Sequence, residues 1–149
     1  MSITISAHPD LALHRIDFFG SIKGAEIAAL ANTHSTHKDW AGADTIHVVD
    51  EAADLSEIDH AGLDKVRAHY QALHRTIDFF LLRRAGWVCV KPQALNLVEY
   101  WLKGRHSLDG QGTEVNLVQR WQDLTDVFTV EELAAAERGH GLAELWRVG

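Results

Sequence analysis

The acidic segment Asp50–Asp59 contains the side chains whose type and spacing come closest to a chemical site. Its carboxylates are Asp50, Glu51, Asp54, Glu57 and Asp59. They follow a predicted strand, and the carboxyl edge of an α/β sheet is where such folds bind ligands. Carboxylate oxygens are also ligands that Mg²⁺ prefers. The favoured interpretation is nevertheless that these acids cap the following helix and match the positive charge of its N-terminus.

Histidine and cysteine offer two further candidates. His34 and His37 are three residues apart on a predicted helix, so they could present two ligands to a metal ion. The sequence shows no third ligand, and the place of His34 on the apolar face favours a partly buried, hydrogen-bonded side chain. Cys89 lies mid-strand between two valines, where burial raises the pKa of a thiol and makes it unreactive.

Motifs of the common enzyme classes are absent from the sequence. There is no G-x-S-x-G, Walker A loop, C-x-x-C pair or G-x-G-x-x-G, and no Cys-His or Ser-His-Asp arrangement in a fitting context. We therefore expect a non-enzymatic protein with no cofactor and no physiological metal site.

Composition restricts the class of protein and its partners. The 149 residues, of which 46% are hydrophobic and 23% charged, suit one globular domain spanning 1–149. The single cysteine excludes a disulfide within the chain. The formal net charge of -7 argues against a nucleic-acid partner, because phosphate binding needs clustered Lys and Arg.

Nothing in the sequence has the pattern of a targeting or membrane segment. The N-terminal residues MSITISAHPD lack the basic and apolar regions of a secretory signal. No window approaches the roughly 18–20 apolar residues that a membrane span needs. We expect a cytoplasmic protein of bacterial type.

The predicted elements that would position these side chains begin with two strands. Ser2–Ala7 and Leu11–Phe19 alternate apolar and polar residues around a Pro-Asp break, which is typical of a β-hairpin. A helical period follows from Ile22 to about Trp40. Thr45–Val49 is then a short β-branched strand.

A second predicted helix carries the strongest periodic signal in the chain. Its apolar face is formed by Leu63, Val66, Tyr70, Leu73 and Ile77. The segment Phe79–Leu82 is then joined through Arg83–Gly86 to a predicted strand at Trp87–Val90, which is followed by a helix at Leu95–Leu102 and a strand at Glu114–Trp121. Thr129–Glu132 has the form of a capping box and opens a last helix.

The resulting order of elements is β-β-α-β-α-β-α-β-α. Alternation of this kind predicts an α/β fold with a mainly parallel sheet, right-handed crossovers and an antiparallel edge formed by the N-terminal hairpin. Residues 142–149 are assigned to no element of this predicted fold.

Two segments resemble the STAS domain of anti-sigma-factor antagonists, which has the SpoIIAA-like fold. Leu11–Ile27, LALHRIDFFGSIKGAEI, is similar to that family's second strand, glycine turn and first helix. Ile58–Leu63, IDHAGL, opens the second helix where the family carries an Asp-Ser-Ser-Gly-Leu-type motif. The resemblance spans roughly Ile3 to Glu137. The chain also looks similar to a bacterial group of STAS-like proteins related in fold to the lipid-binding CRAL-TRIO domain.

In the STAS family, the first serine of that motif is phosphorylated by the anti-sigma kinase and controls partner binding. Here His60 and Ala61 stand in place of the two serines, while Asp59, Gly62 and Leu63 remain. The resemblance therefore implies a regulatory scaffold without the serine switch.

The sequence favours a non-enzymatic binding or regulatory module. We expect its site at the carboxyl ends of the parallel strands, formed by Asp50, Asp54, Asp59, His60 and Gly62. The partner is either another protein or a small apolar ligand, and a homodimer is left open. The alternative is a small enzyme that uses the Asp50–Asp59 carboxylates with a divalent cation.

Overall fold

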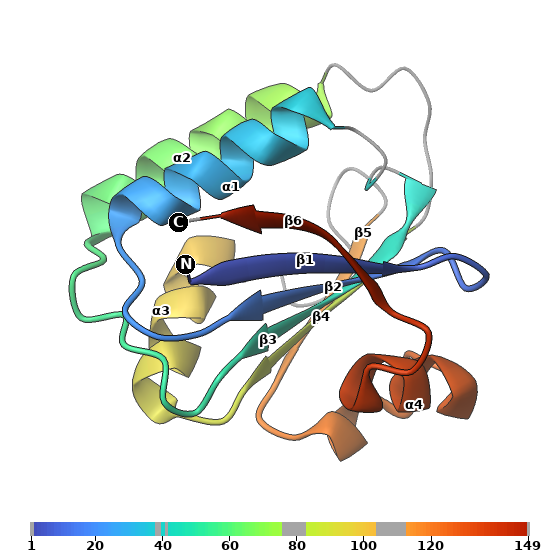
Figure 1. Ribbon diagram of the computed structural model, residues 1–149. Helices are drawn as coiled ribbons and strands as arrows, with labels where there is room; N and C mark the ends of the chain where they lie inside the picture. The colour runs from blue at the N-terminus through green and yellow to red at the C-terminus, as the bar shows by residue number, and fades with distance from the viewer. Residues whose placement is uncertain (1, 38–39, 41, 76–82, 104–112, 149) are drawn as a thin grey trace.

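Strands and helices alternate along the chain as the sequence predicts (Figure 1). The computed structural model describes residues 2–37, 40, 42–75, 83–103 and 113–148. The elements, in chain order, are β1 (Ile3–His8), β2 (Leu13–Phe18), α1 (Gly24–Thr36), β3 (Asp44–Val49), α2 (His60–His74), β4 (Arg83–Cys89), α3 (Pro92–Leu102), β5 (Thr113–Val118), the 3-10 helix η2 (Trp121–Leu124), α4 (Val130–Arg138) and β6 (Ala143–Val148).

The described strands form one six-stranded sheet with the order β5-β4-β3-β2-β1-β6. β2, β3, β4 and β5 run parallel, whereas β1 is antiparallel to both of its neighbours. The predicted α/β class, the mainly parallel sheet and the antiparallel N-terminal hairpin are confirmed. β6 belongs to the tail that the sequence left unplaced, and it pairs with β1 on the outer side of the hairpin.

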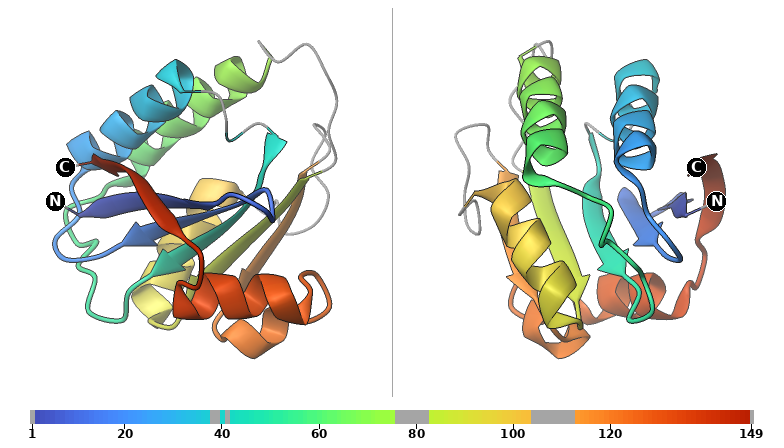
Figure 2. Two further views of the ribbon diagram at one scale, coloured as in Figure 1. Left: turned by 45° about the vertical axis from the view of Figure 1, so that its right-hand side comes forward. Right: turned by 90° about the vertical axis from the view of Figure 1, so that its left-hand side faces the viewer.

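Helices cover both faces of the sheet (Figure 2). α1, α2 and α3 lie on one face, where Leu30, Val66 and Val98 pack against strand residues such as Ile16. α4 and η2 lie on the other face. The smaller core beneath them consists of Leu13, Ile46, Val88, Leu124, Phe128, Leu133 and Ala136.

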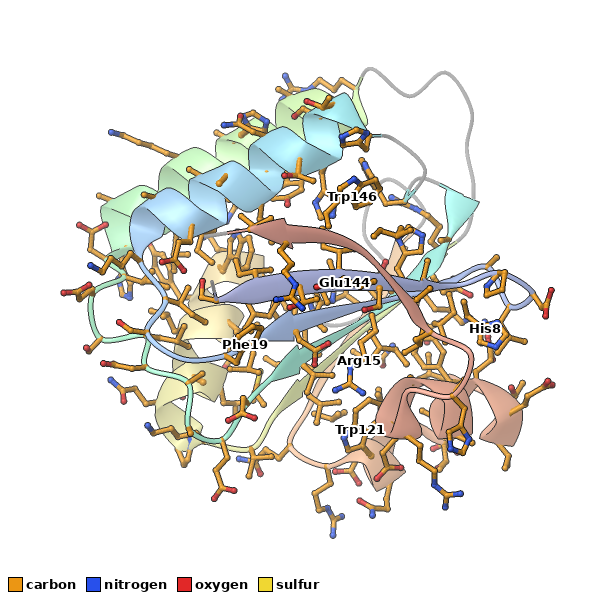
Figure 3. The ribbon with its side chains drawn as sticks, viewed as in Figure 1. His8, Arg15, Phe19, Trp121, Glu144 and Trp146 are labelled. Carbon is orange, nitrogen blue, oxygen red and sulfur yellow. The ribbon has the colours of Figure 1, made fainter. Side chains whose placement is uncertain are left out.

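Arg15 of β2 helps to hold α4 against its face of the sheet. Its guanidinium pairs with Asp17 at 2.7 Å and donates to the main-chain carbonyl of Ala136. It also lies 5.8 Å from the ring centre of Trp121, beside which it is seen in Figure 3. Arg15 therefore adds an ion pair and a ring contact at the edge of the apolar core beneath α4 and η2.

The apolar face predicted for α2 is confirmed. Its buried or core-packed members are Leu63, Val66, Tyr70 and Leu73. Leu73 packs against Trp40, which closes the end of this layer. Ile77, the last residue of the predicted face, lies outside the described residues.

α1 ends earlier than the sequence suggests. The helix stops at Thr36, and the amide of His37 makes the closing hydrogen bond to the carbonyl of Thr33 at 2.9 Å. Trp40 is buried and packs with Leu73. The segment Phe79–Leu82 lies outside the described residues.

β5 also ends earlier, at Val118, because the chain leaves the sheet to cover its second face. Leu124 of η2 is fully buried against Gly86 of β4. A Cβ at Gly86 would lie 3.2 Å from the Leu124 side chain, so glycine allows this close approach.

The predicted capping box opens α4. The Thr129 hydroxyl accepts a hydrogen bond from the amide of Glu132 at 3.1 Å, and Glu132 Oε1 accepts from the amide of Thr129 at 2.9 Å. Gly139 ends the helix with a left-handed φ of 72°.

In the described part of the chain, no helix is long and apolar enough to cross a membrane.

Candidate functional site

The carboxylates predicted to form a site accept hydrogen bonds from their own neighbouring backbone. The amide of Ala52 donates to Asp50 Oδ1 at 2.8 Å, and the amide of Ser56 donates to Asp54 Oδ1 at 3.0 Å. The Ser56 hydroxyl and amide hold the pKa of Asp54 below its usual value. These two acids therefore stabilise the loop between β3 and α2.

Asp59, His60 and Gly62 lie together at the start of α2. Asp59 caps the helix, because its Oδ1 accepts from the amide of Gly62 at 2.6 Å. The exposed His60 ring stacks on Tyr100 of α3, with centroids 3.7 Å apart and an interplanar angle of 9°. Asp59 and Gly62 border a hollow of about 120 Å³ between α1 and α2, whereas Asp50, Asp54 and His60 do not line it.

His34 of α1 and His37, the residue that follows the helix, do not converge on one point. His34 Nδ1 lies 2.6 Å from the Tyr70 hydroxyl, while the His37 ring stacks on Trp146 of β6 at 4.7 Å. Across the ranges that the structure describes, no group of three or more His, Cys, Asp or Glu side chains is placed to hold a metal ion.

Cys89 lies inside the core, as the sequence predicts. Its side chain is fully buried, and this burial raises the pKa of the thiol to about 12. The thiol therefore stays protonated at neutral pH and is a poor nucleophile.

A cavity of about 160 Å³ lies at the opposite, amino end of the parallel strands. It sits between the sheet and the C-terminal turns of α1, α2 and α3. Its lining consists of Ile16, Leu30, His34, Trp40, Ala43, Thr45, His47, Arg67, Tyr70, Arg83, Arg84, Ala85, Trp87, Trp101, Leu102 and Val115. The cavity therefore differs in place from the site expected at the carboxyl ends.

Aromatic rings form much of the wall of this cavity. Trp87 of β4 meets Trp101 of α3 edge to face, with centroids 5.4 Å apart. Tyr70 of α2 lies 6.3 Å from Trp101 in a tilted arrangement. Burial raises the pKa of the Tyr70 hydroxyl, so the side chain remains uncharged at neutral pH. Flat apolar surfaces of this kind favour contacts with another ring.

His47 projects from β3 onto the same wall. Parallel pairing places it directly opposite Trp87, and neighbouring side chains in register share one face of a sheet. The two rings stack with centroids 3.9 Å apart and an interplanar angle of 1°. The position of His47 is therefore fixed by the register of β3 against β4.

The protonation of His47 follows from its surroundings. Its Nδ1 lies 3.1 Å from the carbonyl oxygen of Gly86, and because a carbonyl can only accept, Nδ1 carries a proton. Burial lowers the pKa of the ring to about 4, against the opposing effect of the Gly86 carbonyl. At neutral pH the ring is uncharged and Nε2 holds a lone pair. No residue in the described ranges donates a hydrogen bond to Nε2.

Two arginines of the cavity lining are paired with acids. Arg84 donates to Asp44 Oδ2 at 2.6 Å and to Glu132 Oε1 at 3.0 Å. Arg67 donates to Asp64 Oδ1 at 2.7 Å and to the carbonyl of Trp101 at 2.7 Å, which ties α2 to the end of α3. The positive charge of Arg67 is therefore matched beside the cavity, and that of Arg84 is matched on the α4 face of the sheet.

The third arginine of the lining is placed by an aromatic ring. The guanidinium carbon of Arg83 lies 5.0 Å from the ring centre of Trp40. This contact joins the start of β4 to the segment that follows α1.

Sequence reasoning did not single out His47. A signal was present, because Thr45–Val49 alternates and His47 shares the inward phase with Val49. A polar ring at an inward position of a buried strand is the pattern that could have identified it.

No family model, curated protein or solved structure matches this chain. The STAS resemblance at Ile58–Leu63 therefore stays a prediction, and the site is interpreted from its own geometry.

Proposed function

We propose that this protein is a non-enzymatic binding module that holds a small, largely apolar molecule in the cavity beside His47. The observation that carries the proposal is an aromatic wall around about 160 Å³ of space. An engineered apolar cavity of about 150 Å³ in another protein stays dry and binds benzene, so this volume suits a molecule of one or two small rings.

The small residues of the cavity wall support a ligand. A larger side chain at Ala43 or Ala85, which both line the cavity, would remove the void. Because alanines leave this space open, a ligand that fills it would add packing contacts and stabilise the folded chain.

What the sequence predicts about partners, cellular location and family is unchanged. A protein partner, a homodimer and a cytoplasmic location stay predictions, and so does the relation to STAS-like proteins. The alternative, an enzyme that uses the Asp50–Asp59 carboxylates, gains no support from Asp50 and Asp54, whose oxygens accept from the adjoining backbone.

A calorimetric melting experiment with small aromatic probes tests the proposal. We expect benzene, toluene or indole to raise the Tm of the wild-type protein, because a ligand that binds only the folded state stabilises it by RT ln(1+[L]/Kd). Ala85→Leu fills the cavity, so it should abolish this rise. Ala28→Leu, on the exposed side of α1, is the matched control and should keep it. Absence of a rise in the wild-type protein with all three probes would contradict the proposal.

A further inference from the structure

We infer that the occupant of the cavity is an uncharged planar aromatic molecule that carries a ring N–H or O–H group and donates it to His47 Nε2. The inference rests on the proposed function, since it specifies the ligand of the same cavity.

Three contacts fix the orientation of the His47 ring. Trp87 covers one face of the ring at 3.9 Å, and Phe18 stacks farther away, at 6.4 Å and 25°. The hydrogen bond from Nδ1 to the Gly86 carbonyl sets the rotation of the ring within this stack. Because Nδ1 is thereby the protonated nitrogen, Nε2 is the acceptor. A ligand in the cavity meets a lone pair with a defined direction.

The Gly86 carbonyl that fixes His47 is itself held from the other face of the sheet. Leu124 and Phe128 pack so closely on Gly86 that a Cβ there would lie 3.2 Å and 3.3 Å from their side chains. The strand at this point has little freedom to move. The acceptor is therefore preorganised before a ligand arrives, which reduces the ordering needed on binding.

An acceptor in a largely apolar cavity discriminates between ligands. A bound molecule that excludes water without donating a hydrogen bond leaves Nε2 unsatisfied, and an unmade hydrogen bond in such a place is unfavourable. A molecule that donates an N–H or O–H restores the bond. The site should therefore reject apolar isosteres relative to donors.

The charges around the cavity disfavour an ionic ligand of either sign. A cation would lie near Arg67 and Arg83, which line the cavity, whereas the guanidinium of Arg84 lies on the other face of the sheet with Glu132 and Phe128. An anion would face the lone pair of Nε2 and would compete with Asp64 for Arg67. An uncharged ring avoids both penalties and stacks on the aromatic wall.

Indole and benzofuran form a matched pair of probes, because the two molecules share size and shape while the ring N–H of indole is an oxygen in benzofuran. Isothermal titration of the wild-type protein should show indole binding roughly 2- to 13-fold more tightly, which is the effect of one neutral hydrogen bond. His47→Phe keeps a ring on Trp87 and removes the acceptor. It should bind the two probes within about twofold of each other, as expected when no hydrogen bond distinguishes them.

The outcomes separate the two proposals. Equal affinity of the wild-type protein for indole and benzofuran would overturn the inference and leave the proposed function standing. Failure of both probes to bind would overturn the proposed function itself.

A second measurement does not depend on the folding of the variant. In a protein labelled with ¹⁵N at histidine, indole should move the ring resonance of unprotonated Nε2 in His47, and benzofuran should leave the hydrogen-bonding state of this nitrogen unchanged. An identical response to the two probes would contradict the inference.

Discussion

Acidification should lower the free energy of unfolding of this protein, because the folded state keeps the His47 ring unprotonated. Burial lowers the folded-state pKa of the ring from 6.5 to about 4. Below pH 6.5 the unfolded chain takes up a proton that the folded ring refuses, so stability falls as the pH decreases from 6.5 toward 4. The full shift corresponds to at most about 3 kcal/mol, because one pKa unit is about 1.4 kcal/mol.

The charged groups facing His47 do not reverse this sign. The ionisable side chains that face the same cavity are His34, Arg67, Tyr70 and Arg83, whereas the guanidinium of Arg84 lies on the other face of the sheet with Glu132. The arginines are positive over the whole range, and a positive neighbour further disfavours the imidazolium form.

Urea unfolding at pH 7.5 and pH 4.5 measures the effect. The free energy of unfolding should fall by about 2–3 kcal/mol more in the wild-type protein than in His47→Phe, which has no proton to gain. Contributions from other titrating groups are common to both proteins and cancel in the comparison. His140→Phe replaces an exposed histidine beyond α4 by the same residue and serves as the matched control. Equal loss of stability in the wild-type protein and in His47→Phe would refute the assignment of His47 as a half-buried, neutral ring.

Three further predictions concern packing, charge and regulation. Leu73→Ala should lower the free energy of unfolding by about 2–5 kcal/mol, because Leu73 is buried against Trp40; a loss under about 0.5 kcal/mol in urea unfolding would contradict this packing. Arg84→Met should cost about 1–3 kcal/mol in the same assay, because Glu132 would lose its charged partner, and an unchanged stability would show that the pair contributes little. Incubation with an anti-sigma-type kinase and ATP should leave the intact mass unchanged, because His60 stands where that family has its serine; a stoichiometric gain of one phosphate would contradict this.

The order of elements could be predicted because each of them shows its period locally. The N-terminal hairpin alternates about a Pro-Asp break, and Leu63, Val66 and Leu73 repeat at helical spacing on α2. These patterns depend only on residues that are near neighbours in the sequence, so they can be recognised without the tertiary structure.

β6 was missed because its alternation is interrupted. Trp146 is paired with Ile5 while Glu144 is paired with Ser6, so the strand carries an extra residue, Leu145, at a bulge. The bulge puts Glu144 and Arg147 on the same side, where they form an ion pair. A strict period of two cannot describe such a strand, and its edge position gives it few buried residues. Figure 3 shows Glu144 and Trp146 along this outer strand.

The location of the cavity could not be read from local patterns either. The general tendency of α/β sheets to bind ligands at the carboxyl ends of their strands pointed to Asp50–Gly62. The cavity depends instead on the register that brings His47 beside Trp87, and on the packing of α1, α2 and α3 over the amino ends of the strands. Both are properties of long-range packing. The acidic segment was interpreted more successfully, since Asp59 caps α2 as the favoured interpretation expected.

A titration of ¹⁵N-labelled protein with indole, followed by backbone amide NMR, tests the binding site most directly. The account predicts saturable shifts at Thr45–His47 and Ala85–Trp87, the strand segments that border the cavity, with Asp50–Gly62 unaffected. Shifts confined to Asp50–Gly62 would contradict it and return the site to the carboxyl ends of the strands, and so would a spectrum that indole does not change.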